Sequence, residues 1–328
     1  MKRLWWVYLT LVLLVIGLIL AVYFWLLAPI SRAGTPQLFT VQSAESITSI
    51  ARRLEEQHLI RSIWAFKAYL KISGKVVVQP GTYEISTKNG LIEIANLIAS
   101  GDTTNVTLTI PEGYTLAQIA EQIGQKNIAD ADEFTNITND FPADYEFLKS
   151  RPTGKKSLEG YLFPDTYRLI KGDPTLAIHQ MLDNFNSKYN TDIKPKLGDK
   201  NLYEVVIIAS LVEREVKTTE DMVLVAGVIY NRLKLGMRLD IDATVRYVIN
   251  NWKDPLTRDD LSVDSPYNTR RYAGFPPGPI CNPGLAAIIA ALQPADHDYY
   301  YYLTDYEGIT HYAKTLAEHN QNKLEYLL

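Results

Sequence analysis

The sequence predicts an α+β protein with three parts: one N-terminal transmembrane helix, small α+β modules, and a C-terminal, mainly helical domain that carries a β-hairpin. Three observations predict this class. An uncharged, apolar run occupies residues 4–27. A pattern of strand, turn and capped helix occurs twice between residues 39 and 125. Apolar helical segments then dominate after residue 157, interrupted by a long loop rich in proline and glycine.

Composition narrows the possible functions. The chain has 328 residues, 47% of them hydrophobic, which is enough for two or three modest cores. The net charge of -4 offers no broad basic surface, so we expect no nucleic-acid partner. The single cysteine, Cys281, excludes an internal disulfide framework and a metal site built from several cysteines.

The apolar run at residues 4–27 predicts a retained membrane anchor. At about 1.5 Å per residue, a helix of this length spans the roughly 30 Å hydrocarbon core of a bilayer. The following residues offer no convincing signal-peptidase site. Lys2 and Arg3 precede the run and only Arg32 follows closely, which predicts a cytoplasmic N-terminus. We therefore expect a single-pass protein of the cytoplasmic membrane, with the rest of the chain on the extracytoplasmic side.

Two segments that follow repeat each other, "FTVQSAESITSIARRL" from Phe39 and "LTIPEGYTLAQIAEQI" from Leu108. Each reads as a strand, a turn and a helix capped by Ser or Thr. The aligned pairs are Thr40 with Thr109, Ser46 with Thr115, Ile50 with Ile119 and Ala51 with Ala120. The second copy resembles the LysM-type glycan-binding pattern. For the first copy alone, an ordinary strand-to-helix junction remains the simpler interpretation.

Composition shifts give the expected domain boundaries. Residues 28–38 have the proline, glycine and serine content of a linker, and residues 151–157 resemble a hinge. We expect a cytoplasmic end (1–3), the transmembrane helix (4–27), the linker (28–38), a first small α+β module (39–104), a second, LysM-like module (105–156) and the C-terminal domain (157–328).

Further elements follow from local patterns. Residues 79–86 predict a turn and strand, and residues 91–101 a helix stopped by glycine. Residues 157–169 are either a packed irregular loop or the wall of a cleft. Thr218 with Asp221 caps one helix, Asp242 is a candidate cap for another, and residues 285–294 form a buried helix. Residues 299–313 predict a hairpin, and a helix capped by Thr315 and Glu318 closes the chain.

The helix expected at residues 202–217 carries the strongest chemical signal. Its first part is apolar on all sides, so the domain core encloses it. Glu213 shares a face with the small residue Ala209, and Ser210 lies beside that residue, which leaves room for a ligand. Apolar neighbours raise the pKa of such a carboxyl, which can then donate a proton as a glycosidase acid does. The alternative is a buried Glu213 paired with an arginine. Glu215 points the opposite way, toward a salt bridge or the helix end.

Several reaction classes lack their characteristic residues. The motifs H-E-x-x-H, S-x-x-K, G-x-S-x-G and the P-loop do not occur in the sequence. The five histidines are scattered, and His297 and His311 show no spacing for a metal. We therefore expect neither a metal nor a cofactor.

Five motifs together resemble the endolytic murein transglycosylases, the MltG or YceG-like family. They are "EGYLFPDTY", "ASLVEREV", "NRLKLGMRLDIDATV", "SPYNTRRYAGFPPGPICNPG" and "THYAKTLAEHN". The resemblance implies a lyase that cleaves peptidoglycan between N-acetylmuramic acid and N-acetylglucosamine, limits strand length and leaves 1,6-anhydro ends. Glu213 falls on the first glutamate of the family's V-E-x-E motif, which implies that it acts as acid and then as base.

The same resemblance implies a set of substrate-binding residues. In "EGYLFPDTY" and "SPYNT" they would line the saccharide cleft, with Tyr161 and Tyr267 as stacking faces, although each could equally be loop packing. Asp240 departs from the family's usual Gln and could raise the pKa of Glu213 further. His319 and Asn320 more simply brace the last helix. The full expected set is Glu159, Tyr161, Ser210, Asp240, Tyr267, Asn268, Thr269, His319 and Asn320.

The implied partners are peptidoglycan strands, the cytoplasmic membrane and, in addition, cell-wall synthases of the elongation or division machinery. A competing hypothesis from another class is a non-catalytic envelope scaffold that binds glycan and recruits synthesis enzymes. A hydrolase that leaves reducing ends is a third possibility, and its products would differ from anhydro-ended ones by one water.

Overall fold

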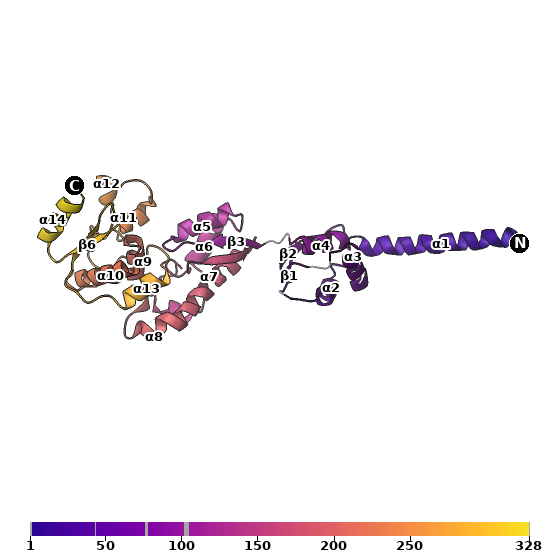
Figure 1. Ribbon diagram of the computed structural model, residues 1–328, viewed down its shortest axis with the longest axis horizontal. Helices are drawn as coiled ribbons and strands as arrows, with labels where there is room; N and C mark the ends of the chain where they lie inside the picture. Colours follow the sequence, from indigo (N-terminus) through magenta and orange to yellow (C-terminus); the bar gives the residue numbers. More distant parts are fainter. Residues whose placement is uncertain (1, 43, 76–77, 102–104, 328) are drawn as a thin grey trace. The chain divides into compact units, whose positions relative to one another are not determined.

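The computed structural model describes residues 2–42, 44–75, 78–101 and 105–327, and for residues 2–10 it describes the backbone alone. The chain divides into two compact units, Met1–Val106 and Thr107–Leu328. Figure 1 shows the order of the elements along the chain. Helices predominate, and the described part of the chain contains three two-stranded sheets, which confirms the predicted α+β class.

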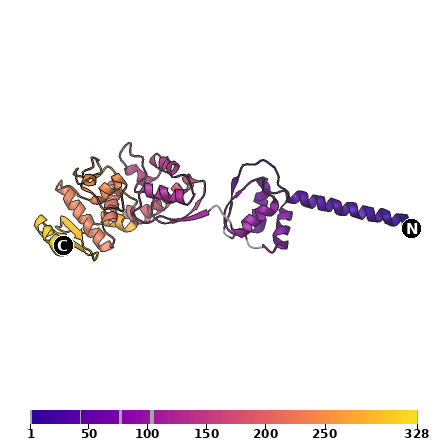
Figure 2. The ribbon, with the colours of Figure 1, turned by 90° about the horizontal axis from the view of Figure 1, so that it is seen from above.

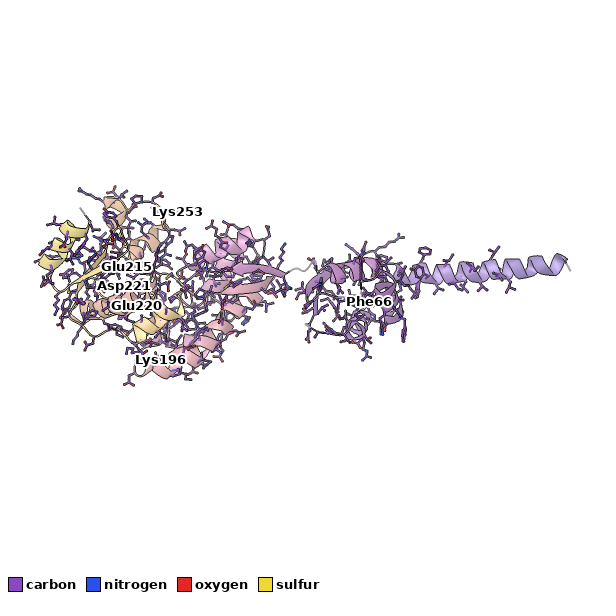
Figure 3. All side chains as sticks on the ribbon, viewed as in Figure 1. Phe66, Lys196, Glu215, Glu220, Asp221 and Lys253 are labelled. Carbon is purple, nitrogen blue, oxygen red and sulfur yellow. The ribbon has the colours of Figure 1, made fainter. Side chains whose placement is uncertain are left out.

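The first unit begins with helix α1 (Lys2–Leu27) and continues as a β-α-α-β module followed by one helix. Strand β1 (Gln37–Val41) pairs antiparallel with β2 (Gly81–Ile85), with Gln37 opposite Ile85. Between them lie α2 (Ile47–Glu56) and α3 (Ile63–Ile72), and α4 (Leu91–Ser100) follows. The core of this unit includes Phe66, which is fully buried and labelled in Figure 3. The predicted strand at residues 79–86 and the glycine-stopped helix at 91–101 are therefore confirmed.

The predicted linker, residues 28–38, is attached to the first unit. The Arg61 guanidinium donates hydrogen bonds to the backbone oxygens of Ala28 and Pro29, the latter at 2.8 Å. The Ser31 amide donates to the Thr87 oxygen at 3.1 Å. This segment is held against the module by backbone contacts, which its composition did not indicate.

Among the helices whose side chains are described, none is both long enough and apolar enough to cross a membrane. The predicted span at residues 4–27 lies partly outside this set, because residues 4–10 have no described side chains.

The second unit opens with another β-α-α-β module. Strand β3 (Asn105–Thr109) is followed by α5 (Leu116–Gln125), α6 (Ala131–Asn139) and a short 3-10 helix (Glu146–Ser150), and it pairs with β4 (Thr166–Ile170). The second strand of this module therefore comes from residues that the sequence assigned to the C-terminal domain. The segment 157–169 is packed rather than open, since Leu158, Leu162 and Phe163 are buried.

The remaining helices form the core of the second unit. They are α7 (Pro174–Lys188), a π-helical turn (Tyr189–Ile193), α8 (Lys194–Leu197), α9 (Leu202–Glu215), α10 (Thr219–Lys234), α11 (Asp242–Ile249), α12 (Arg258–Leu261) and α13 (Leu285–Leu292). Helix α9 packs against α10, α11 and α13, and its residues up to Val212 are buried except Glu204, as predicted. Composition did not indicate α7, whose cap is Asp173.

A hairpin of β5 (Tyr301–Thr304) and β6 (Thr310–Ala313) and the helix α14 (Leu316–Tyr326) close the chain. Thr315 and Glu318 form the predicted capping box. Thr218 caps α10 as predicted, whereas Asp242 lies in the first turn of α11 and does not cap it. Within the second unit, α14 lies at the end opposite to β3 in both views (Figure 1, Figure 2).

Candidate active site

The predicted acid, Glu213, lies in the last turn of α9, where the helix leaves the core. The backbone becomes extended at Val216 and Thr218 caps the next helix, so α9 stops soon after its apolar part. Glu213 is half-buried, and its Oε2 accepts a hydrogen bond from the Gly284 amide at 3.0 Å. Among the residues that the structure describes, it forms no ion pair. The alternative of an arginine-paired glutamate is therefore wrong.

Burial raises the pKa of Glu213 to about 7. The hydrogen bond from Gly284 and the charge of Arg214 act in the opposite direction, and the charge of Glu112 adds to the increase in pKa. A carboxyl with this pKa holds its proton in a large fraction of molecules near neutral pH, so it can serve as a general acid.

Glu213 lines a cavity of about 410 Å³ that opens to solvent. The space lies beyond the end of α9 and not above Ala209 and Ser210, which are fully buried. The walls come from the end of α9, from α11, from a turn of the second module and from Trp252. The lining residues are Glu112, Gly113, Glu213, Arg214, Glu215, Val216, Lys217, Asp242, Ala243, Arg246 and Trp252.

Arg214, next to Glu213 in sequence, is engaged elsewhere. Its Nη1 donates to the Gly113 oxygen at 3.0 Å, and its guanidinium carbon lies 3.6 Å from the centre of the Trp252 ring. This stacked pair forms a flat wall of the cavity, and such surfaces suit sugar rings.

Asn282 joins the second module to the site. Its backbone exchanges hydrogen bonds with the turn, from the Gly113 amide to Asn282 at 2.9 Å and from the Asn282 amide to Tyr114 at 2.8 Å. Its side-chain oxygen accepts from the Gly160 and Leu162 amides, each at 2.9 Å. One fully buried amide therefore ties the turn, the 157–169 segment and the loop before α13 together.

Glu159 completes this buried network. It accepts hydrogen bonds from the Leu116 amide at 3.0 Å, from the Asn282 side chain at 3.0 Å and from the Tyr247 hydroxyl at 3.3 Å. Burial raises the pKa of Glu159 to about 8 against these hydrogen bonds, which lower it. Glu159 contacts the first residue of α5 and the loop before α13, so it braces the module against the core. It also lines a second cavity.

The second cavity, of about 460 Å³, holds the predicted stacking residue Tyr267. The Tyr267 ring lies 5.1 Å from that of Tyr247, centre to centre, and Glu159 lines the same space. None of the residues that line this cavity lines the Glu213 cavity. The structure therefore does not bring Tyr267 together with the acid.

Four predicted contact residues are buried and support the fold. Tyr161 is fully buried in an aromatic cluster with Phe147 and Phe185, so it offers no stacking face. The Ser210 hydroxyl accepts from the Ile280 amide at 3.1 Å. The remaining two brace loops: the Asn268 side chain donates to the backbone oxygens of Leu261 and Val263, and the hydroxyls of Thr269 and Thr244 lie 3.0 Å apart.

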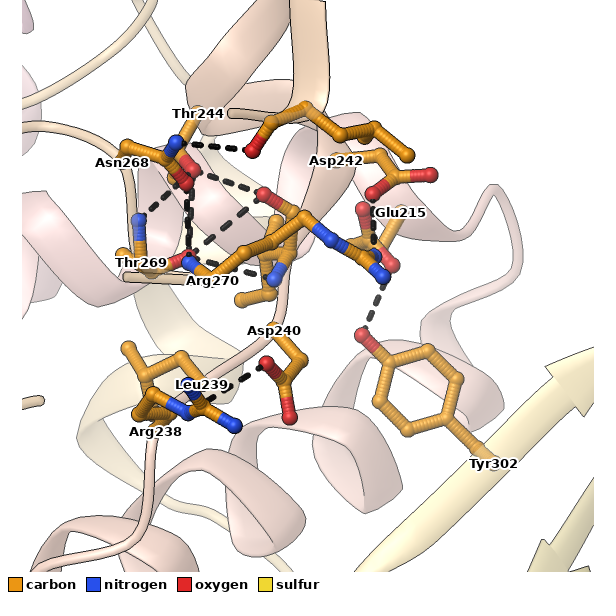
Figure 4. A network of polar contacts seen from close by, with 12 residues as sticks. Glu215, Arg238, Leu239, Asp240, Asp242, Thr244, Asn268, Thr269, Arg270 and Tyr302 are labelled. Carbon is orange, nitrogen blue, oxygen red and sulfur yellow. Dashed lines mark hydrogen bonds and ion pairs between the residues drawn. The ribbon is translucent and has the colours of Figure 1, made fainter. Parts of the chain in front are cut away.

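Asp240 and His319 line a third cavity, of about 450 Å³, beside the polar network shown in Figure 4. Asp240 lies 3.8 Å from Arg232 and 3.9 Å from Arg238, and it is Glu112, not Asp240, whose charge raises the pKa of Glu213. His319 stacks on Tyr301 in this cavity, which fits a bracing role, whereas Asn320 is exposed.

Glu215 is the last residue of α9, as one of its two predicted roles had it, and it forms no salt bridge with any described residue. Its Oε2 instead accepts a hydrogen bond from the Tyr302 hydroxyl at 2.7 Å, as Figure 4 shows. Burial raises the pKa of Glu215, and the charge of Asp242 adds to the increase. Glu215 therefore links α9 to the C-terminal hairpin.

Sequence reasoning missed Glu112, Asn282 and Trp252. The sequence "IPEG" around Glu112 indicates a turn and nothing more. Asn282 belongs to the loop sequence "CNPG", which carries no sign of its contacts. Nothing in the local pattern near Trp252 marks it as a wall of the site. Across the described residues, no group of three or more His, Cys, Asp or Glu side chains could hold a metal ion.

Comparison with known proteins agrees with the resemblance noted above. The model of the YceG-like family matches residues 39–325. The endolytic murein transglycosylase of Bacillus subtilis (strain 168) is 35% identical over 317 residues, which covers 92% of this chain and 88% of the relative. That of Streptococcus pneumoniae (strain D39) is 32% identical over 320 residues and is covered to only 58% of its length.

A solved structure is also similar. The crystal structure of a protein from Listeria monocytogenes described as yceG-like matches with a TM-score of 0.58 and 31% sequence identity. The match covers 88% of this chain and 99% of that chain.

Proposed function

The chain belongs to the YceG-like family, and from that premise we propose that it is an endolytic murein transglycosylase with Glu213 as its acid and base. Its substrate is the bond between N-acetylmuramic acid and N-acetylglucosamine in nascent peptidoglycan strands. Cleavage leaves 1,6-anhydro ends and limits the length of the strands.

The single observation that carries this proposal is the position of Glu213. It combines a pKa of about 7, a free Oε1 among the described residues, and a solvent-open cavity of about 410 Å³. The protonated carboxyl donates its proton to the glycosidic oxygen as the bond to the anomeric carbon breaks. The C6 hydroxyl of the muramic residue then attacks that carbon and returns a proton to Glu213. Water is not a reactant, so one carboxyl can serve both steps.

The location of the reaction is part of the proposal. Residues 4–27 are uncharged in the sequence, and α1 (Lys2–Leu27) covers them. Large apolar side chains such as Leu14, Leu18 and Phe24 are exposed on it. We propose that this helix anchors the chain in the cytoplasmic membrane with its N-terminus inside, close to cell-wall synthases as partners. Release of the full chain from membranes by alkaline carbonate would contradict the anchor.

A glycan-binding role for the two β-α-α-β modules belongs to the same proposal. Its support is the LysM-like pattern of the second copy and the presence of the Pro111–Gly113 turn in the wall of the Glu213 cavity. We expect Glu213→Gln to bind isolated glycan strands and a chain that lacks both modules to lose this binding. If the shortened chain still bound glycan strands, the modules would not be the binding site.

Digestion of isolated glycan strands by the full chain in detergent tests the activity. We expect anhydro-ended products, identified by mass spectrometry because they lack one water relative to hydrolysis products. Glu213→Gln keeps the shape of the side chain and removes the proton, so the rate should fall by about 10²- to 10⁴-fold with binding intact. The matched control is Glu204→Gln, an exposed position on the same helix.

The outcomes separate the competing hypotheses. Reducing ends instead of anhydro ends would identify a hydrolase. Binding of strands without any cleavage by the unmodified chain would support the non-catalytic scaffold. An unchanged rate in Glu213→Gln would reject this residue as the acid.

A further inference from the structure

Glu112 is another carboxylate in the wall of the Glu213 cavity, and it comes from the β-α-α-β module of the second unit. It lies in the turn between β3 and α5, one residue before Gly113. The residue is exposed. Within the described ranges of the chain, its carboxylate accepts no hydrogen bond and forms no ion pair. Both oxygens are therefore available to a ligand in the cavity.

The approach of Glu112 to Gly284 requires a glycine at that position. A Cβ atom on Gly284 would lie 1.9 Å from Oε1 and 2.2 Å from the carboxyl carbon of Glu112. The amide of the same glycine donates the hydrogen bond to Glu213 at 3.0 Å. The two carboxyl groups thus flank a single backbone residue, one on its amide and one on its α-carbon.

The turn that carries Glu112 is held firmly against the site. Gly113 has a φ of 80°, which favours glycine, and a Cβ there would lie 3.5 Å from Cγ of Glu213. Arg214 and Asn282 both bond to the backbone of this turn. The backbone next to Glu112 is therefore held by two segments that are distant in sequence, the end of α9 and the loop before α13.

The charges around Glu213 are mixed. The charged side chains that line its cavity besides Glu213 are Glu112, Arg214, Glu215, Lys217, Asp242 and Arg246. The thiol of Cys281, which interacts electrostatically with Glu213, is buried. Arg214 stacks on Trp252, Glu215 bonds to Tyr302, Asp242 pairs with Arg270, and Arg246 donates to backbone oxygens. Among the carboxylates of this cavity, Glu112 is therefore the one with no partner in the described part of the chain.

We propose that Glu112 is a substrate-contacting residue of the active site, whose negative charge stabilises the positive charge that develops on the muramic ring as the glycosidic bond breaks. This inference rests on the proposed transglycosylase function and deepens it. The small β-α-α-β module thereby supplies part of the catalytic machinery and is more than a glycan-binding attachment. Two carboxyl groups then have separate roles, Glu213 as the acid and Glu112 as the charge that stabilises the transition state.

The balance of the reaction is unchanged by this role. The bond from the anomeric carbon to the leaving oxygen breaks, and the proton of Glu213 goes to that oxygen. The bond from O6 to the anomeric carbon forms, and the O6 proton goes to Glu213. Glu112 forms no covalent bond and transfers no proton.

The test compares Glu112→Gln with the unmodified full chain on isolated glycan strands, with kcat and KM measured by anhydro-ended products from pH 5 to 9. Loss of the charge should lower kcat by about 10- to 100-fold with little change in KM. The basic limb of the kcat/KM profile should move to lower pH, because Glu112 helps Glu213 to retain its proton. Glu112→Asp keeps the charge and should restore the position of that limb.

Two controls accompany these variants. Glu121→Gln alters an exposed carboxylate of the same module and should leave kcat, KM and the pH profile unchanged. Because Glu112 is exposed and has no described partner, the melting temperature of Glu112→Gln should equal that of the unmodified chain.

The outcomes are distinguishable. Absence of anhydro ends with the unmodified chain would overturn the proposed function and this inference together. If the unmodified chain produced anhydro ends but Glu112→Gln kept both the kcat and the basic limb of the pH profile, the inference alone would be overturned. A loss confined to KM would also overturn it, since Glu112 would then bind sugar without stabilising the transition state.

Discussion

The two β-α-α-β modules follow one plan, and the turn after the first strand is used differently in each. Each pairs its strands through a threonine contact, Thr40 with Thr82 at 3.1 Å and Thr109 with Thr166 at 2.9 Å. In each, the turn after the first strand has a left-handed residue, Ala44 with φ 61° in the first copy and Gly113 with φ 80° in the second. The local sequence pattern therefore produces the same backbone twice.

Each turn carries one acidic residue beside its left-handed position, Glu45 directly after Ala44 and Glu112 directly before Gly113, and the two carboxylates have different environments. Glu45 of the first copy accepts hydrogen bonds from the Gln42 amide, Ser49 and Arg53, the last as an ion pair at 3.0 Å. Burial raises the pKa of Glu45, but the hydrogen bonds from Gln42, Ser49 and Arg53 together hold it below its usual range. Glu112 of the second copy has no such partners among the described residues and faces a cavity. One carboxylate is therefore used within its own module, whereas the other faces a cavity and has no partner among the described residues.

The largest expected effect comes from Asn282→Ala, which removes the side-chain hydrogen bonds that join the second module to the loop before α13. Four side-chain hydrogen bonds are lost: three buried ones, with Gly160, Leu162 and Glu159, and a partly buried one to Tyr114. We expect the free energy of unfolding of the second unit to fall by about 3–5 kcal/mol and activity to be lost. Hydrogen exchange should show this loss in residues 107–328 and none in the first module.

The control for that variant is Asn190→Ala, an exposed asparagine of the same unit. An equal loss of protection in both units, or a fully active Asn282→Ala protein, would contradict the role given to Asn282.

A smaller effect is expected in the pH dependence of stability. The pKa of Glu213 in the folded state, about 7, lies above the value of 4.5 for an unperturbed glutamate. The folded state therefore binds the proton more tightly, so stability is fully present below about pH 4.5 and decreases as the pH rises to about 7. Glu213→Gln should reduce this decrease by about 2 kcal/mol.

Chemical unfolding of both proteins at several pH values measures that difference. For Glu204→Gln on the same helix, the free energy of unfolding should change with pH as it does in the unmodified chain. If Glu213→Gln and the unmodified chain lost stability in parallel between pH 4.5 and 8, the raised pKa of Glu213 would be disproved.

The smallest effect is a pair of opposite changes at the two left-handed positions. Gly113→Ala places a Cβ in a backbone conformation that disfavours it and should destabilise the second unit by about 1 kcal/mol. Ala44→Gly relieves the same strain in the first module and should stabilise it by about 0.5 kcal/mol. Thermal unfolding of each variant gives both signs, and a loss of stability in Ala44→Gly would show that the two turns are not equivalent.

Local pattern predicted much of the fold because its causes are local. The caps Ser46, Thr115 and Thr218, the glycine stop after α4 and the hairpin turn all act within a few residues of themselves. The strand β4 could not be assigned to the second module, since its partner β3 is more than fifty residues away in sequence. Helix α7 was missed because its apolar residues are interspersed with polar ones and carry no long run.

The candidate site divides in the same way. Glu213 was predictable, because an acidic residue at the end of an otherwise buried helix meets both the core and solvent. Four of the nine expected sugar contacts were not, since Tyr161, Ser210, Asn268 and Thr269 occur in motifs whose side chains turn inward. A motif shows that residues belong together without showing which of them face a ligand.

Helices, their caps and the repeated module follow from the chain's local patterns, because periodicity and capping depend on neighbouring residues, and the same patterns singled out Glu213 as the candidate acid. The surroundings of Glu213 follow from tertiary packing instead. Glu112, Gly284 and Trp252 come from three distant segments, and their meeting depends on how α9, the Pro111–Gly113 turn and the loop before α13 pack. Burial and the charges of such neighbours set the pKa of Glu213, and both are properties of the packed molecule.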